Sequence, residues 1–153
     1  MKLIEAPDSL KKFRKTAWEF QQTFQTPLKN LEPFVTLIVS AGDIETAQLN
    51  VAEVVFEPKH LTSALRQYLI PGEFRRDRAF VAESRGEVQC LLLAALSDWL
   101  DFAFVPKPTK FAIYADHDEY VTFYAHRRGI LNGLITALEA EDFERVPNWQ
   151  RRF

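Results

Sequence analysis

Glycine and cysteine are both scarce in this chain. Its 153 residues include only five glycines, one cysteine and one methionine. The lone Cys90 cannot form an internal disulfide, which excludes a disulfide-stabilised secreted scaffold and favours a reducing, cytoplasmic location. The glycines form no phosphate-binding loop, and the G-x-S-x-G, H-E-x-x-H and paired Cys/His patterns do not occur. The sequence therefore predicts no catalytic residue, no metal site and no cofactor.

Long apolar runs and an excess of one charge sign are missing as well. The longest apolar run, CLLLAAL at 90–96, is far shorter than the roughly 20 residues that span a bilayer. The N-terminal residues contain no apolar signal region. Charged residues make up 26% of the chain with a net charge of −2, which is too balanced for a disordered chain or a protein that is basic overall. We expect a globular protein with no membrane partner.

Aromatic residues, by contrast, are abundant. The chain has thirteen Phe, three Trp and four Tyr, and such rings either fill a core or lie on a binding face. A chain of this length can bury roughly 68–70% of its unfolded surface as one domain. No repeat or linker divides it, so residues 1–153 are predicted to form a single domain.

Apolar residues recur at helical spacing in four segments. The predicted helices cover residues 9–25, 58–69, 84–100 and about 130–138, and the third begins with the capping-box pair Ser84 and Glu87. Runs rich in β-branched and aromatic residues predict a strand pair at 34–40 and 49–57, a strand at 102–106, a β-hairpin at 110–125 and a short edge strand within 143–149. Residues 73–83 are ambiguous. This mixed order indicates an α+β fold, with an antiparallel or mixed sheet of about four to six strands packed by about four helices.

The hairpin provides the main functional hypothesis. Because side chains alternate across a strand, burying Phe111, Ile113, Val121 and Phe123 leaves the tyrosines on the other, outer face. That face lies beside an acidic turn and precedes an arginine pair. The predicted partner-binding residues are Tyr114, Asp116, Asp118, Glu119, Tyr120, Thr122, Tyr124, Arg127 and Arg128.

Tyrosine and arginine dominate protein–protein hot spots, and acidic residues at the edge of the face would repel a phosphate backbone. The pattern favours a non-enzymatic module that binds a protein with a basic surface, such as an immunity-type inhibitor of a toxin or enzyme. The same pattern also fits a tyrosine face covered by a helix and an acidic turn that is only solvated. Four consecutive residues, Asp116 to Glu119, cannot all aim at one metal ion, so the turn is not predicted to be a metal site.

Two alternatives remain open. A nucleic-acid accessory protein would use the basic clusters Lys11–Lys15 and Arg75–Arg78, provided that they converge in space. The first cluster falls in the opening turns of the predicted 9–25 helix, where the helix dipole disfavours cations. A second acidic cluster, between Glu139 and Glu144, argues against this function. A small-molecule enzyme would instead need Glu53 or His126 in a pocket.

Overall fold

The computed structural model describes all residues, 1–153, and its frame is one antiparallel sheet of eight strands. The strands are β1 (Lys2–Glu5), β2 (Phe20–Gln25), β3 (Thr46–Glu53), β4 (Arg78–Ala82), β5 (Asp101–Lys107), β6 (Ala112–Ala115), β7 (Tyr120–Ala125) and β8 (Arg145–Val146). They lie in the order β1-β4-β3-β5-β6-β7-β2-β8. The α+β class is confirmed, but the sheet is larger than the predicted four to six strands.

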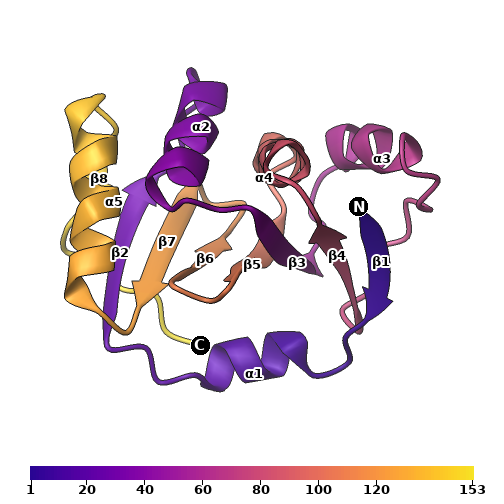
Figure 1. Cartoon of the computed structure of the whole chain (residues 1–153), viewed down its shortest axis with the longest axis horizontal. Coiled ribbons are helices and arrows are strands. Elements are labelled where there is room, and N and C mark those ends of the chain that lie inside the picture. The colour runs from indigo at the N-terminus through magenta and orange to yellow at the C-terminus, as the bar shows by residue number, and fades with distance from the viewer.

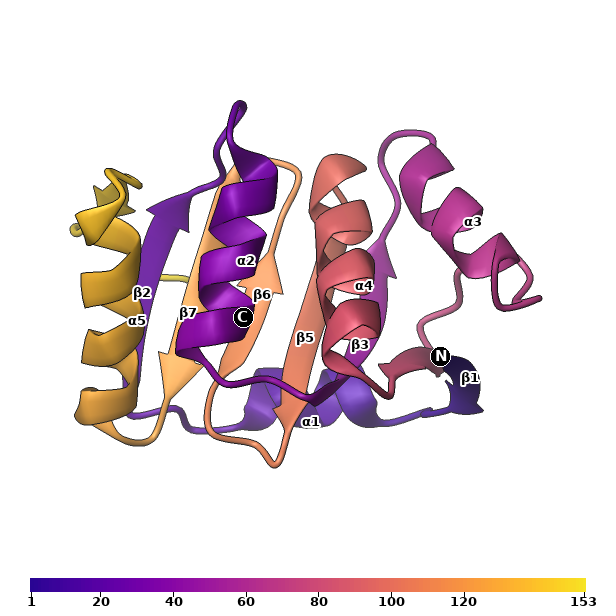
Figure 2. The ribbon, with the colours of Figure 1, turned by 45° about the horizontal axis from the view of Figure 1, so that its top comes forward.

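Helices cover the two faces of the sheet unequally (Figure 1). The inner face carries α2 (Leu31–Ala41), α3 (Lys59–Arg66), α4 (Arg85–Ser97) and α5 (Arg128–Ala140), which lie in front of the sheet in Figure 2. The outer face carries α1 (Ser9–Lys15) and the C-terminal residues. No helix combines the length and the apolarity needed to cross a membrane.

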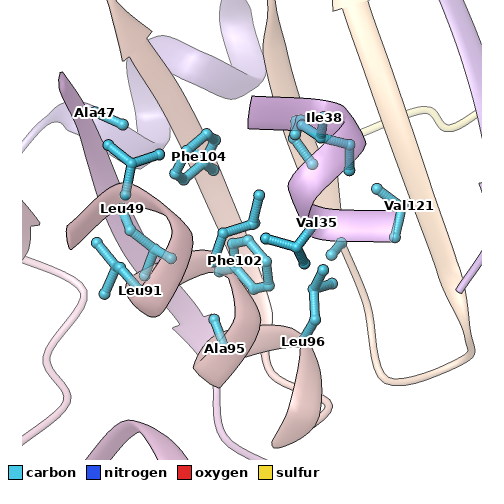
Figure 3. Packing of buried hydrophobic residues seen from close by; sticks show 14 of the residues in the cluster. Val35, Ile38, Ala47, Leu49, Leu91, Ala95, Leu96, Phe102, Phe104 and Val121 are labelled. Atoms are coloured by element: carbon cyan, nitrogen blue, oxygen red, sulfur yellow. The ribbon is translucent and has the colours of Figure 1, made fainter. Parts of the chain in front are cut away.

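The main core lies between the inner face and these helices (Figure 3). Phe102 and Phe104 of β5 are completely buried because they alternate onto the inner face. They pack with Leu49 of β3 beneath Val35 of α2 and Leu91 of α4. Complete burial of one such side chain contributes roughly 1.5–3 kcal/mol.

Two predicted elements are wrong. Residues 20–25 form β2 rather than the end of a helix, and residues 31–41 form α2 rather than a strand. Phe20 and Phe24 are four residues apart, which places them on one face in a strand as well as in a helix, so their spacing does not distinguish the two. In 31–41 the β-branched residues favour a strand, but the buried positions Phe34, Val35, Ile38 and Val39 have helical spacing.

The other predicted elements agree with the structure to within a few residues, whereas β1 was not predicted. The predicted cap forms: the hydroxyl of Ser84 accepts a hydrogen bond from the Glu87 amide at 3.2 Å. The Glu87 carboxylate bonds back to the amide of Glu83, one residue before the cap rather than at it, also at 3.2 Å. The hairpin, α5 and the edge strand β8 form as expected, and the ambiguous segment contains β4.

Four helices end without a glycine where one is usually found. In α5, the amide of Asp142 bonds to the carbonyl of Glu139, and the amide of Phe143 bonds to that of Leu138. This Schellman pattern places Asp142 in the left-handed region at φ 62°. The same pattern ends α2, α3 and α4, with the left-handed positions held by Asp43, Leu69 and Trp99. No glycine in the chain has a positive φ.

Candidate functional site

Most of the tyrosine face is covered. Phe111, Ile113 and Phe123 belong to the main core, so the hairpin divides as the alternation predicts. On the outer face, however, Tyr114 and Tyr124 are only 5% and 3% exposed and pack against Phe13 of α1. Thr122 is completely buried. Tyr114 and Tyr124 therefore belong to a second, smaller core.

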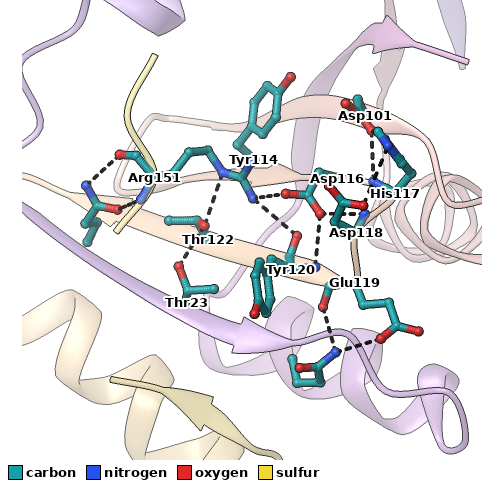
Figure 4. A network of polar contacts seen from close by, with 12 residues as sticks. Thr23, Asp101, Tyr114, Asp116, His117, Asp118, Glu119, Tyr120, Thr122 and Arg151 are labelled. Carbon is teal, nitrogen blue, oxygen red and sulfur yellow. Dashed lines mark hydrogen bonds and ion pairs between the residues drawn. The ribbon is translucent and has the colours of Figure 1, made fainter. Parts of the chain in front are cut away.

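The C-terminal segment covers the rest of this face through Arg151 (Figure 4). Its guanidinium lies 2.7 Å from the Asp116 carboxylate and 4.8 Å from the centre of the Tyr114 ring. Nearby, Trp149 packs on Tyr120 with ring centres 4.7 Å apart. Asp116 and Tyr120 are thus already engaged within the chain.

The arginine pair is not close to the acidic turn. Arg127 and Arg128 are exposed where β7 passes into α5, at the end of β7 opposite to the turn. Arg128 stacks on Phe20, with its guanidinium carbon 4.6 Å from the ring centre. Of the predicted partner-binding residues, Asp118 and Glu119 therefore form the accessible part of the turn.

The turn lies beside two other loops at the same end of the strands. Residues at the end of β2 form hydrogen bonds that hold these loops together. The amide of Thr26, just after β2, bonds to the carbonyl of Glu119 at 2.7 Å. The amide of Gln25 bonds to the carbonyl of Glu144 at 2.9 Å. The side-chain amide of Gln25 also donates to the Glu119 carboxylate at 3.1 Å. Segments far apart in the sequence are thereby held together.

These loops enclose a groove of about 700 Å³, here called the acidic groove. Its carboxylates are Glu119, Glu141, Asp142 and Glu144, and its only cationic side chain is Lys29. None of these carboxylates forms an ion pair. Leu28, which is 75% exposed, lies on the same lining. The groove thus combines concentrated negative charge with an exposed apolar side chain.

Only one of the four groove carboxylates, Glu119, was among the predicted site residues. The cluster between Glu139 and Glu144 was visible in the sequence, but only as an argument against nucleic-acid binding. Its position beside Glu119 depends on the insertion of β2 between β7 and β8. Because residues 20–25 were predicted as a helix, nothing in the sequence pattern indicated that the two acidic clusters meet.

Two aspartate–histidine pairs lie along this edge. Asp98 is 4% exposed and accepts hydrogen bonds from the amides of His60 and Leu61 at 3.0 and 2.7 Å. Asp101 accepts from both the amide and the ring Nδ1 of His117, at 2.9 and 2.7 Å. The hydrogen bond that the His117 ring donates to Asp101 raises the pKa of His117 above its ordinary value. Neither Asp98 nor Asp101 is simply a solvated residue at a helix end, because both carboxylates hold neighbouring segments.

The candidate catalytic residues have few partners. Glu53 is exposed at the end of β3, opposite Asp101 in the sheet register. His126 lines a groove of about 410 Å³ and stacks on Trp18 at 4.7 Å, but it forms no hydrogen bond and has no carboxylate beside it there. Burial raises the pKa of the Cys90 thiol, which disfavours the nucleophilic thiolate. No group of three His, Cys, Asp or Glu side chains could hold a metal ion.

No protein-family model, curated protein or solved structure matches this chain. Any functional argument therefore depends on the chemistry of its own surface.

Proposed function

We propose that this protein is a non-enzymatic interaction module that binds a protein with a basic surface at the acidic groove, as an immunity-type inhibitor of a toxin or enzyme. The observation that carries the proposal is the gathering of four unpaired carboxylates, Glu119, Glu141, Asp142 and Glu144, in one groove. Clustered like charges repel one another, and a cationic partner would remove that repulsion. Asp118, whose side chain is 77% exposed, extends the negative charge along the turn.

A stable interface needs apolar contacts as well as complementary charge. Exposed apolar side chains lie at the same end of the strands. Val54, Val55 and Phe56 follow β3 directly and are 40%, 43% and 56% exposed. Their loop lies between the two acidic residues Glu53 and Glu57. A typical interface buries about 800 Å² on each partner and is anchored by a few apolar or aromatic side chains. Leu28 and this loop are suitable anchors on a surface that is otherwise acidic.

The covered tyrosine face changes how the hypothesis must be tested. Replacement of Tyr124 by Ala would remove a buried ring and unfold part of the outer core, so a loss of binding would be uninformative. The groove carboxylates, in contrast, are solvent-accessible and can be neutralised with little effect on packing.

The test is capture followed by a binding measurement. The tagged chain serves as bait in a lysate of its source organism, beside a groove variant with Glu119→Gln, Glu141→Gln and Glu144→Gln. A control variant with Glu19→Gln, Glu73→Gln and Glu83→Gln makes the same charge change at exposed positions outside the groove. We expect one basic protein to be retained in stoichiometric amount by the wild type and the control but not by the groove variant.

Calorimetry with the purified pair then gives the magnitude. Three lost charge contacts should weaken binding by at least about tenfold, which corresponds to about 1.4 kcal/mol. Added enzyme assays should show that the captured protein loses its activity when bound. Equal affinity of the wild type and the groove variant, or an equal loss in the control, would refute the assignment of the groove.

A further inference from the structure

A basic surface surrounds α1, on the opposite face of the sheet from the other helices. One groove of about 510 Å³ beside α1 is lined by Lys11, Arg14, Lys15 and, from the segment before β4, Arg76. The groove on another side of α1 contains Lys12 together with Lys107 of β5. Arg76 of the Arg75–Arg78 cluster therefore lies beside the Lys11–Lys15 cluster, whereas Arg75 and Arg78 pair with Asp77 and Glu5.

Helix stability explains part of this arrangement. Because α1 ends at Lys15 rather than continuing to residue 25, Lys12, Arg14 and Lys15 lie in its last turn. Cations there are favoured by about 0.3–1 kcal/mol, which reverses the expectation from the sequence. The helix dipole does not explain Arg76 or Lys107, which come from other elements and add to the same surface.

The positive charge of this surface is not neutralised within the chain. None of the six cations, Lys11, Lys12, Arg14, Lys15, Arg76 and Lys107, forms an ion pair. Two acidic residues line these grooves: Asp77 is bound to Arg75 at 2.6 Å, and Asp8 lies beside Lys11, Lys12 and Lys15, which outnumber it. The groove that contains Lys12 and Lys107 has no acidic lining residue. An external anion would find several unpaired cations here.

Aromatic rings lie among these cations. Phe153 is 55% exposed, packs on Phe13 and lies 5.6 Å below the guanidinium carbon of Arg14. At the other end of the surface, the exposed His126 ring stacks on Trp18. Proteins that bind single-stranded nucleic acid combine cations that contact the phosphate backbone with exposed rings on which bases stack. Their spread along both sides of α1 suits an extended polyanion better than a compact one.

We infer that the α1 surface binds single-stranded nucleic acid without sequence preference. The lysines contact phosphates, and the rings of Phe153 and His126 stack on unpaired bases. This site is independent of the acidic groove, which lies at the sheet edge and repels phosphate.

The inference is tested by fluorescence anisotropy with a labelled oligouridylate of about 20 nucleotides, titrated between about 50 and 200 mM salt. The main variant combines Lys11→Gln, Lys12→Gln and Lys15→Gln. The control combines Lys2→Gln, Lys59→Gln and Arg66→Gln, which are exposed, lie away from α1 and do not line the acidic groove. Each phosphate contact contributes about 0.7 to the slope of log affinity against log salt, so the main variant should lower the slope by about 2. The control should match the wild type.

A stacking variant tests the second half of the inference. Phe153→Ala leaves the charge unchanged and removes an exposed ring, and it should weaken binding to the oligonucleotide by about tenfold. A duplex of the same length should bind more weakly than the single strand, because its bases are already stacked. The inference would be overturned by absence of binding at low salt, by an equal loss of affinity in the control variant, or by equal affinity for the duplex. Partner capture at the acidic groove should be unchanged in the lysine variant, which separates the two sites.

Discussion

At the scale of single residues, the start of α3 depends on a carboxylate from a distant part of the chain. Pro58, at the N-cap position, provides no side-chain hydrogen bond. Asp98 accepts the amides of His60 and Leu61 instead and so performs the role of an N-cap residue. The sequence shows an aspartate near a helix end, but only the packing of α3 beside α4 shows what that aspartate bonds to.

Replacement of Asp98 by Ala should therefore destabilise the protein by about 2 kcal/mol, since the part-buried amide of His60 and the buried amide of Leu61 lose their acceptor. Urea unfolding followed by circular dichroism measures this loss. Asp118→Ala, at an exposed position on the same edge, is the matched control and should change stability little. Equal unfolding midpoints for the two variants would show that Asp98 does not cap α3.

The His117–Asp101 pair should make stability depend on pH. The pKa of His117 is raised in the folded protein, so the charged ring is favoured by folding. Its contribution is fully present below the ordinary pKa of 6.5 and is lost as the pH rises through the folded pKa. The stability difference between the wild type and Asp101→Asn should thus be larger at about pH 6 than at about pH 8, as urea unfolding can measure. A difference that does not change with pH would contradict the pairing.

At the scale of elements, the ends of several helices are less stable than glycine would make them. Leu69 and Asp142 occupy left-handed positions where glycine would be free of steric cost. Leu69 is also 94% exposed, so its side chain contributes almost no burial. Backbone strain of this kind often persists where a side chain serves a function. For Asp142 that function is proposed here: its carboxylate lines the acidic groove.

Leu69→Gly and Asp142→Gly should each stabilise the protein by about 1 kcal/mol through release of the left-handed strain. Only Asp142→Gly removes a groove carboxylate, so only that variant should bind the partner less tightly. Ser63→Gly, at an exposed position in the middle of α3, should instead destabilise, because glycine there only increases the conformational entropy of the unfolded chain. Thermal unfolding and calorimetry separate these effects. A weaker complex with Leu69→Gly as well would show that the groove charge is not responsible.

Elements with a strong local signal were predictable. The capping serine before α4, the proline at the start of α3 and the alternation in the hairpin each specify their own structure. Residues 20–25 were not, because their spacing fits a helix and a strand equally and the strand is chosen by pairing with β7 and β8. Residues 31–41 contain β-branched residues that favour a strand, but packing on α4 and α5 stabilises the helix instead.

At the scale of the whole molecule, the candidate site emerges only from topology. The acidic turn was predicted from the sequence as part of a binding site, whereas Glu141, Asp142 and Glu144 join it because β2 lies between β7 and β8. The covering of the tyrosine face has the same origin, since α1 and the C-terminal segment cross a surface to which they are not adjacent in sequence. Local patterns predict which residues share a strand face, but not which segment packs on it.

The placement of the acidic groove and the basic α1 surface on different sides gives the molecule an electric dipole, although its net charge is only −2. A dipolar molecule rotates in the field of a charged partner before they touch, so productive encounters become more frequent than random diffusion allows. Dissolved salt screens this field over about 10 Å at 0.1 M. Raising the ionic strength should therefore slow association more than it hastens dissociation, and the protein would find its partner fastest in dilute buffer.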